Sequence, residues 1–260
     1  MNHWSKLSID YANQKSYLDD LFQVYPTIPE GIRDINKDLW LNVERAYSIK
    51  DNVKLIEELL KLDLFPVKDS YIAFLKRDKS ALKRNPRTIN RICGRLYEMG
   101  LEKIFEKCSE PKETNRQIGP MFKNWLNSKS MGIQPVKLNT FIKNKDDAIL
   151  DASDAEMMKF AQKYLGYNHN KGLDFVGRFN KKYVIGEAKF LTDFGGHQNA
   201  QFNDAISTIE AEGVDAIKIA ILDGVLFIKG KNKMYKSVTE SYKDYNIMSA
   251  LVLREFLYQI

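Results

Sequence analysis

Three charged residues in the second half of the chain have the types and spacing needed for hydrolytic chemistry: Asp174, Glu187 and Lys189. Two carboxylates that face each other can hold one hard divalent cation, and they repel each other unless a positive charge compensates. Mg²⁺ prefers oxygen ligands and keeps several waters, one of which becomes a nucleophile toward a phosphodiester. The lysine adds a positive charge beside that position. A surface hairpin with solvated charges is the alternative interpretation.

The elements that must position these side chains are two strands, residues 172–179 and 182–190, joined by a turn at residues 180–181. Side chains two apart in a strand point to the same face, so Glu187 and the lysine lie together. A two-residue turn also brings Asp174 directly opposite Glu187, with Cβ atoms about 4.5–5.5 Å apart. The same register sets Lys189 opposite Gly172, where glycine leaves room for the lysine side chain.

The surrounding pattern predicts an α/β fold, a mixed β-sheet flanked by helices, with an N-terminal helical region. Helices and strands alternate in the second half, which is typical of such a sheet. The dipeptide Asp223-Gly224 is a hairpin turn signal. The further expected elements are a strand at 136–142, a helix from Ser153 to Gly166, a helix at 198–210, a strand pair at 216–222 and 225–228, and a helix at 242–258.

Positive charge is concentrated in the middle of the chain. The net charge is +6 overall, but residues 76–145 carry 17 Lys and Arg against 6 Asp and Glu, and the rest of the chain is net negative. A localised positive field suits a polyanion such as nucleic acid. A solvated lysine-rich face fits the charge density equally well.

Within this segment, residues 83–96 have a clear helix start, because Asn85 can cap and Pro86 suits the first helical position. Apolar residues form one stripe and arginines repeat every fourth position on another face, as in a helix that meets DNA phosphates or guanine edges. A plain amphipathic surface helix is the alternative. The candidate DNA-binding residues of this region are Arg84, Arg87, Arg91 and Arg95, with Arg116 and Lys123 on a second amphipathic helix.

The segments Gly172–Phe179 and Tyr183–Phe190 resemble the core of PD-(D/E)xK nucleases, and more narrowly that of type II restriction endonucleases. Leu173 stands where the usual proline precedes the aspartate. The resemblance covers roughly residues 150–230. It implies that Asp174 and Glu187 are the metal-binding acids and Lys189 the catalytic lysine, and that such an enzyme cleaves double-stranded DNA with Mg²⁺, often as a homodimer.

Many members of that group carry a further acid on the helix before the aspartate, and Glu156 sits on such a helix. Glu156 is therefore a catalytic candidate, although the run Ser153-Asp154-Ala155-Glu156 is equally a capping box. After the second strand, Gly195-Gly196 permits a close turn, and the side chains of His197, Gln198 and Asn199 can contact bases or phosphates. Helix capping is the alternative role for these three.

We expect two domains: residues 1–130, a helical and basic DNA-binding region, and residues 131–260, the nuclease core. The two cysteines, Cys93 and Cys108, form no disulfide framework, and no apolar stretch is long enough for a membrane span, so a cytoplasmic location is expected. The leading hypothesis is a Mg²⁺-dependent, sequence-specific endonuclease. A repair or recombination nuclease and a helix-turn-helix regulator without enzymatic activity are the alternatives.

Overall fold

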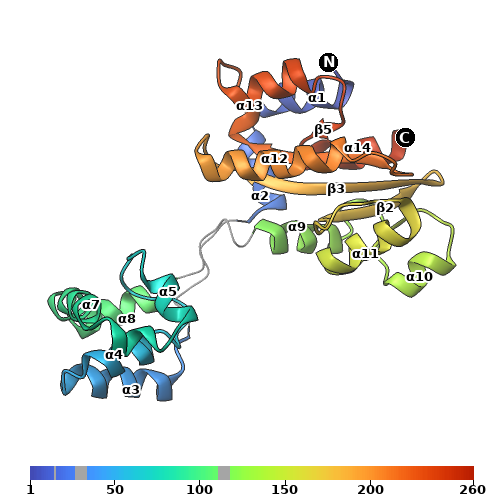
Figure 1. Cartoon of the computed structure of the whole chain (residues 1–260). Coiled ribbons are helices and arrows are strands. Elements are labelled where there is room, and N and C mark those ends of the chain that lie inside the picture. Colours follow the sequence, from blue (N-terminus) through green and yellow to red (C-terminus); the bar gives the residue numbers. More distant parts are fainter. Residues whose placement is uncertain (15, 27–33, 111–117) are drawn as a thin grey trace. The chain divides into compact units, whose positions relative to one another are not determined.

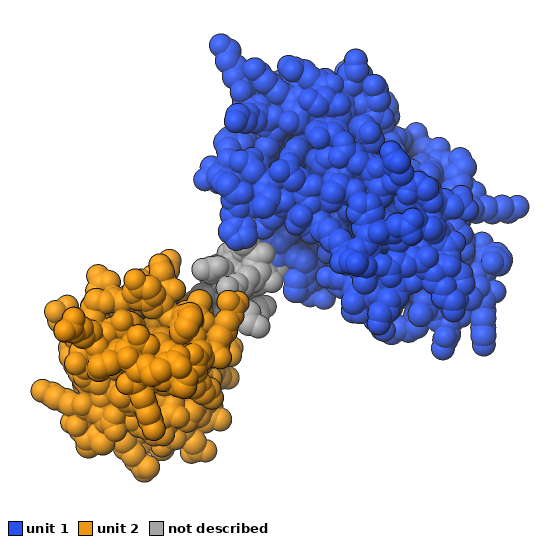
Figure 2. Space-filling view, in the orientation of Figure 1, with its two compact units in different colours: residues 1–27, 114–260 blue, residues 28–113 orange. Residues whose placement is uncertain are grey.

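The chain divides into two compact units. The computed structural model describes residues 1–14, 16–26, 34–110 and 118–260. One unit spans residues 28–113 and is called the helical unit below; the other combines residues 1–27 with 114–260 and is called the sheet unit (Figures 1 and 2). The expected single boundary near residue 130 is thus replaced by an insertion, because the first helices pack on the sheet rather than with the helical unit.

A five-stranded mixed sheet forms the centre of the sheet unit, in the order β1-β2-β3-β4-β5. The pairs β1–β2 and β2–β3 are antiparallel, whereas β3–β4 and β4–β5 are parallel. The mixed sheet flanked by helices is therefore confirmed. The strands are β1 (Ala148–Ile149), β2 (Phe175–Phe179), β3 (Lys182–Leu191), β4 (Ile217–Gly224) and β5 (Ile247–Met248).

Helices cover both faces of this sheet (Figure 1). On one face, side chains of α2, α9 and α14 share an apolar cluster with Val184 and Ala188 of β3. On the other, α11 and α12 cover successive parts of β3, and α12 makes the crossover to the parallel strand β4. The helices are α1 (His3–Ala12), α2 (Tyr17–Val24), α9 (Ile118–Asn127), α10 (Leu138–Lys143), α11 (Asp154–Leu165), α12 (Gly196–Glu210), α13 (Lys233–Lys236) and α14 (Ala250–Gln259), with the short elements η2 (Val225–Phe227) and η3 (Ser237–Ser241).

The β2–β3 hairpin has the expected register. Phe179 pairs with Lys182, and the ladder continues to Phe175 opposite Gly186. The two turn residues, Asn180 and Lys181, have φ of 48° and 65°, the left-handed conformation that a two-residue turn needs to match the twist of its strands. The predicted register of the two strands is therefore confirmed from Phe175 to Gly186.

The hairpin expected at residues 216–228 is wrong. The strand β4 runs through Asp223 to Gly224 and is followed by η2, because β3 and β5 already occupy both of its edges as parallel neighbours. Asp223 is fully buried instead of exposed in a turn. Gly224, with φ of 98°, lies so close to the Leu191 carbonyl that a side chain there would collide with it.

Two further expectations are corrected. The segment 136–142 is mainly the helix α10, since Leu138 and Phe141 are also spaced for a helix and Phe141 is buried; Val136 forms only an isolated bridge with Leu150. The expected helix 242–258 begins only at Ala250, after β5. No helix among the described residues is long and apolar enough to cross a membrane.

The helical unit has its own apolar core and contains the predicted basic helix. That helix is α7, with Pro86 at its first position and the apolar stripe Ile89, Ile92 and Leu96 buried. Asn85 precedes it as expected, but its side chain donates to the Ala81 carbonyl and makes no cap. The helices of this unit are α3 (Lys37–Ser48), α4 (Asn52–Leu59), α5 (Ile72–Arg77), α6 (Ala81–Arg84), α7 (Pro86–Met99) and α8 (Leu101–Cys108).

Candidate active site

Glu187 and Lys189 lie on the sheet face that α11 and α12 cover, at the point where one apolar cluster ends and the other begins. Ile185, two residues earlier on β3, packs in the cluster beneath α11, and Leu191, two residues later, packs in the cluster beneath α12. Alternation along the strand gives all four side chains the same face. The two charged residues therefore fill the gap between two apolar patches.

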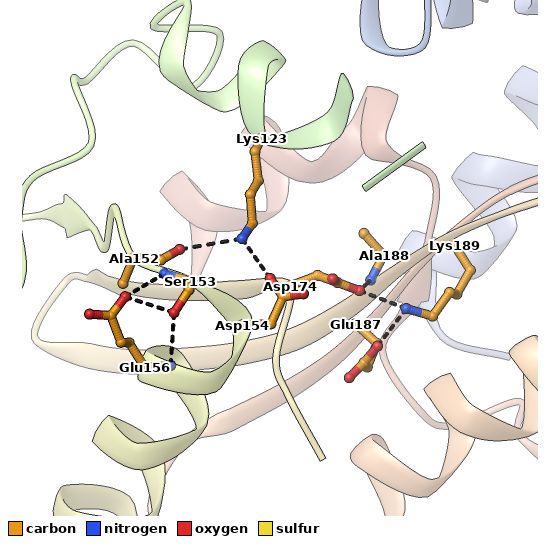
Figure 3. A network of polar contacts seen from close by, with 9 residues as sticks. All are labelled: Lys123, Ala152, Ser153, Asp154, Glu156, Asp174, Glu187, Ala188 and Lys189. Carbon is orange, nitrogen blue, oxygen red and sulfur yellow. Dashed lines mark hydrogen bonds and ion pairs between the residues drawn. The ribbon is translucent and has the colours of Figure 1, made fainter. Parts of the chain in front are cut away.

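Asp174 is the residue just before β2, and its side chain lies at the same point. Lys189 Nζ lies 2.7 Å from Asp174 Oδ2 and 2.7 Å from Glu187 Oε2, and the backbone N–H of Ala188 donates to Asp174 Oδ2 at 3.0 Å (Figure 3). The side chains of Asp174 and Glu187 are 15% and 2% exposed. The predicted trio is thus one buried cluster, with the ammonium between the two carboxylates.

One detail of the predicted register does not hold. The ladder ends at Phe175, and the backbone N–H of Asp174 donates to the Gly186 carbonyl at 3.1 Å. Gly172 does not make room for Lys189: a Cβ there would lie 2.9 Å from the Cβ of Asp154. The glycine is required because the start of α11 packs against the segment that leads into Asp174.

Burial makes the two carboxyls unequal. Burial alone would raise the pKa of Asp174, but the Lys189 ammonium and the Ala188 N–H outweigh it and hold that pKa below its ordinary value. For Glu187, burial and the neighbouring Asp174 charge raise the pKa to about 8. Burial opposes the charge of Lys189, yet the two carboxylates raise its pKa. Glu187 is therefore the acid whose charge this site stabilises least.

The donor set fits a divalent cation. Glu187 Oε1 is buried and has no hydrogen-bond partner among the described residues, although an unpaired buried oxygen costs about 1–3 kcal/mol. Two carboxylates suffice for Mg²⁺, which keeps several of its waters. Nowhere in the described part of the chain do three or more His, Cys, Asp or Glu side chains gather as a metal cluster. The oxygen left without a hydrogen bond is the one a cation would use.

Lys171, which is not among the residues predicted from the sequence, lies on the other side of Glu187. Its Nζ is 3.9 Å from Glu187 Oε1 and 3.5 Å from Asp204 Oδ1 of α12. This nitrogen atom is buried and has no hydrogen-bond partner among the described residues. Its charge helps to keep the pKa of Glu187 from rising further. Only the fold brings this loop residue to β3, so no sequence pattern signals it.

Glu156 performs the capping role. Its Oε2 accepts from the backbone N–H of Ser153 at 2.9 Å and from the Ser153 hydroxyl at 2.7 Å, and it points away from the cluster around Lys189 (Figure 3). The acid that touches the segment before Asp174 is Asp154, whose backbone carbonyl accepts from the Leu173 N–H at 3.2 Å. This geometry favours capping over catalysis for Glu156.

Lys123 belongs to the sheet unit and not to a separate DNA-binding region. Its Nζ lies 2.5 Å from Asp154 Oδ1 and 3.3 Å from the Ala152 carbonyl (Figure 3). It therefore joins α9 to the start of α11. Its side chain remains 32% exposed, so a contact with DNA near the candidate site stays a prediction.

The three polar residues that begin α12 separate into two kinds. His197 and Asn199 are exposed. Gln198 is buried, and its amide bonds to the backbone N–H and the hydroxyl of Thr192, both at 3.3 Å. This geometry favours a role for Gln198 in fixing the loop after β3, instead of the DNA contact that the sequence predicts.

The predicted basic residues of the helical unit are exposed but not all unpaired. Arg91 lies 2.5 Å from Asp69 and over the ring of Tyr71, and Arg84 lies 2.6 Å from Asp78. Arg87 and Arg95 project from the same helix as Arg91 and are exposed. Arg116 lies outside the described residues. The arginine face of α7 is therefore exposed as predicted.

Comparison with known proteins decides the family. The family model described as Tsp45I type II restriction enzyme matches residues 2–260. The chain belongs to this family. It is a site-specific deoxyribonuclease that binds DNA, and the enzymatic reading of the Asp174 cluster is favoured over a regulator without activity. No curated protein and no solved structure gave a match.

Proposed function

We propose that the protein cuts double-stranded DNA in a Mg²⁺-dependent reaction at a PD-(D/E)xK-type site, in which Asp174 and Glu187 hold the metal and Lys189 is the catalytic lysine. The observation that carries this proposal is the buried Oε1 of Glu187, which accepts no hydrogen bond from the described residues, within a cluster of two carboxylates and one ammonium. A bound Mg²⁺ supplies a polarised water and neutralises charge on the phosphate.

The chain's own residues have separate tasks in this proposal. The Ala188 N–H fixes the carboxylate of Asp174, and the apolar clusters on either side of Glu187 keep bulk water from the acids. Exclusion of water strengthens every charge interaction in the site. Lys189 ties both carboxylates together in the metal-free site. Its ammonium can turn toward a scissile phosphate, orient the attacking water and offset the charge that develops.

The number of candidate sites in one chain supports the proposal of a homodimer. The described residues contain one such cluster, and cutting both strands of a duplex at one recognition site calls for two. We propose that two copies act on opposite strands of a palindromic site.

Free buried cysteines, Cys93 and Cys108, fit the proposed cytoplasmic location.

We further propose that α7 binds DNA. If Arg87, Arg91 and Arg95 contact phosphates, replacing all three with Ala weakens specific and non-specific binding alike. The slope of log affinity against log salt then falls by about one for each lost contact. If one of them reads a base, discrimination falls by about 1–3 kcal/mol at a single position. Unchanged affinity and slope would remove α7 from the interface.

Plasmid cleavage tests the metal site. With Mg²⁺, the purified protein is expected to give discrete fragments, and excess EDTA to stop the reaction; Ca²⁺ is expected to support binding without cutting. Glu187→Gln should abolish cleavage. Glu156→Gln, a matched change at an exposed glutamate, should keep it. Undiminished cutting in EDTA or by the Glu187→Gln protein would remove the site, and loss of cutting in Glu156→Gln would restore Glu156 as a catalytic candidate.

A further inference from the structure

A lysine-rich loop follows β4 on the sheet unit, outside the basic segment that dominates the charge of the sequence. From residue 224 to residue 239 the chain has no Asp or Glu. Within the described residues, the one ion pair of its lysines joins Lys229 to Asp10 at 3.6 Å, and both side chains are at least half exposed. The exposed lysines are Lys229, Lys231, Lys233 and Lys236. Residues 228–236, a loop that runs into the short helix α13, are called the lysine loop below.

Both ends of the lysine loop are held in place. Phe227 just before it and Met234 within it are buried, 0% and 2% exposed. The Asn232 side chain closes the loop, because it accepts from the backbone N–H of Tyr235 at 2.7 Å and donates to the carbonyl of Ile228 at 3.3 Å. The lysines therefore project from a backbone with a defined position.

The sheet brings the lysine loop to the same end as the candidate site. The strands β3 and β4 run parallel, with Lys189 beside Leu222 and Leu191 beside Gly224. The loops that follow the two strands thus leave the same end of the sheet, and the β2–β3 turn lies at the other (Figure 1). Ile228 is six positions after Leu222, so the loop begins within about 25 Å of Lys189, at most roughly seven base pairs of duplex.

We propose that the lysine loop binds the phosphodiester backbone of the DNA duplex that is cut at the candidate site, on the flank of the scissile phosphate. This inference rests on the proposed function. Lysine ammonium groups act as point charges that suit phosphates better than base edges. Such contacts fix the position of a duplex and carry no sequence information. They therefore hold the scissile phosphate over Asp174 and Glu187 whatever the flanking sequence.

The test combines the changes Lys229→Gln, Lys231→Gln and Lys233→Gln in one protein. DNA affinity is measured in Ca²⁺ over a range of KCl concentrations, on a duplex with long flanks. We expect the affinity at 0.1 M KCl to fall at least about tenfold and the log–log salt slope to decrease by about 0.9 for each lost phosphate contact. On a duplex with flanks of about two base pairs, where the loop meets no DNA, the difference from the parent should disappear.

The matched control replaces three exposed lysines near the opposite end of β3, Lys145, Lys181 and Lys182, with Gln. This protein loses the same charge, and its affinity and slope should stay near those of the parent. The single-turnover cleavage rate at saturating protein should be equal for the parent, the loop variant and the control. If parent and control cut and the loop variant binds with the parental slope, the loop does not contact DNA; if the parent itself cuts no DNA in Mg²⁺, the proposed function fails instead.

Discussion

Two buried carboxylates on neighbouring strands have opposite surroundings. Asp223 on β4 is fully buried and accepts from the Ser249 hydroxyl at 2.5 Å, the Ala250 N–H at 3.1 Å, and the hydroxyls of Tyr25 and Tyr17 at 3.2 and 3.4 Å. Glu187 on β3 is almost as buried. Its Oε2 meets Lys189, and its Oε1 has no hydrogen-bond partner among the described residues.

The contrast distinguishes an acid that stabilises the fold from the acid that we propose as a metal ligand. Burial raises the pKa of both, but the four donors hold Asp223 at about 6, whereas Glu187, close to the Asp174 charge, reaches about 8. Saturated hydrogen bonding recovers most of the cost of burying a charge. An acid that the fold leaves undersatisfied raises the free energy of the metal-free protein, and a cation removes that cost.

The largest expected effect is on cleavage. Lys189→Ala removes the ammonium that the two carboxylates share, so it should lower the single-turnover rate by about 10²–10⁴-fold, since proton positioning and charge stabilisation each contribute in this range. DNA affinity measured in Ca²⁺ should stay near the parental value. Lys182→Ala, at the exposed start of the same strand, is the control. A Lys189→Ala protein that cuts at the parental rate would end the catalytic interpretation of the motif.

The next effect is on stability. Asp223→Ala leaves four donors without their acceptor, all of them buried, and should lower the free energy of unfolding by about 3–5 kcal/mol. Glu187→Gln should lower it little or not at all, because the amide avoids burying a poorly compensated charge. Urea denaturation of the metal-free proteins measures both. Equal losses of unfolding free energy in the two variants would contradict the different roles assigned to Asp223 and Glu187.

A pH series sharpens the same contrast. The pKa of Glu187 is raised from 4.5 to about 8 by folding, so its contribution to stability is complete below pH 4.5 and is lost as the pH rises to 8. Gln does not titrate, so the melting temperature of Glu187→Gln relative to the parent should increase from pH 5 to pH 8 and then level off. Mg²⁺ should raise the melting temperature of the parent but not that of the variant. A difference that is flat with pH would contradict this assignment.

The smallest expected effect concerns one donor of Asp223. Tyr25→Phe keeps the ring that packs beside Phe190 and removes one hydroxyl, so it should cost about 0.5–1.5 kcal/mol of unfolding free energy and leave cleavage unchanged. Thermal and urea denaturation measure the first, and single-turnover cleavage the second. A loss of unfolding free energy as large as that of Asp223→Ala would show that Tyr25 alone accounts for the stabilising effect of the four donors.

The features that sequence reasoning predicted are local. The two-residue turn at Asn180 and Lys181 fixes the register of β2 and β3, and the register brings Asp174 to Glu187 and Lys189. The same reasoning misread Asp223-Gly224 as a turn. Asp223 is buried because it accepts hydrogen bonds from tyrosines about 200 positions earlier in the chain. No local sequence pattern predicts such distant partners.

The domain boundary predicted near residue 130 differs from the observed division for a related reason. Residues 1–27 have an ordinary amphipathic pattern that suits either unit, and the surface they cover is made near the other end of the chain: Ser5 Oγ donates to the Ile247 carbonyl, and the Ser249 N–H donates to Ser8 Oγ. Lys171 is invisible to sequence reasoning in the same way, since its neighbours Glu187 and Asp204 come from two different elements.

The contact between the two ends of the chain sets the order in which a newly made molecule can fold. Domains form as units while the ribosome is still adding residues, and the helical unit has all of its residues once position 113 is made. The sheet unit cannot be completed then, because β5, Ser249 and α14, which α1 and Asp223 require, follow the helical unit in the chain. The sheet unit, which contains the Asp174 cluster, therefore cannot be completed until residues 247–259 have been made, when all residues of the helical unit are already present.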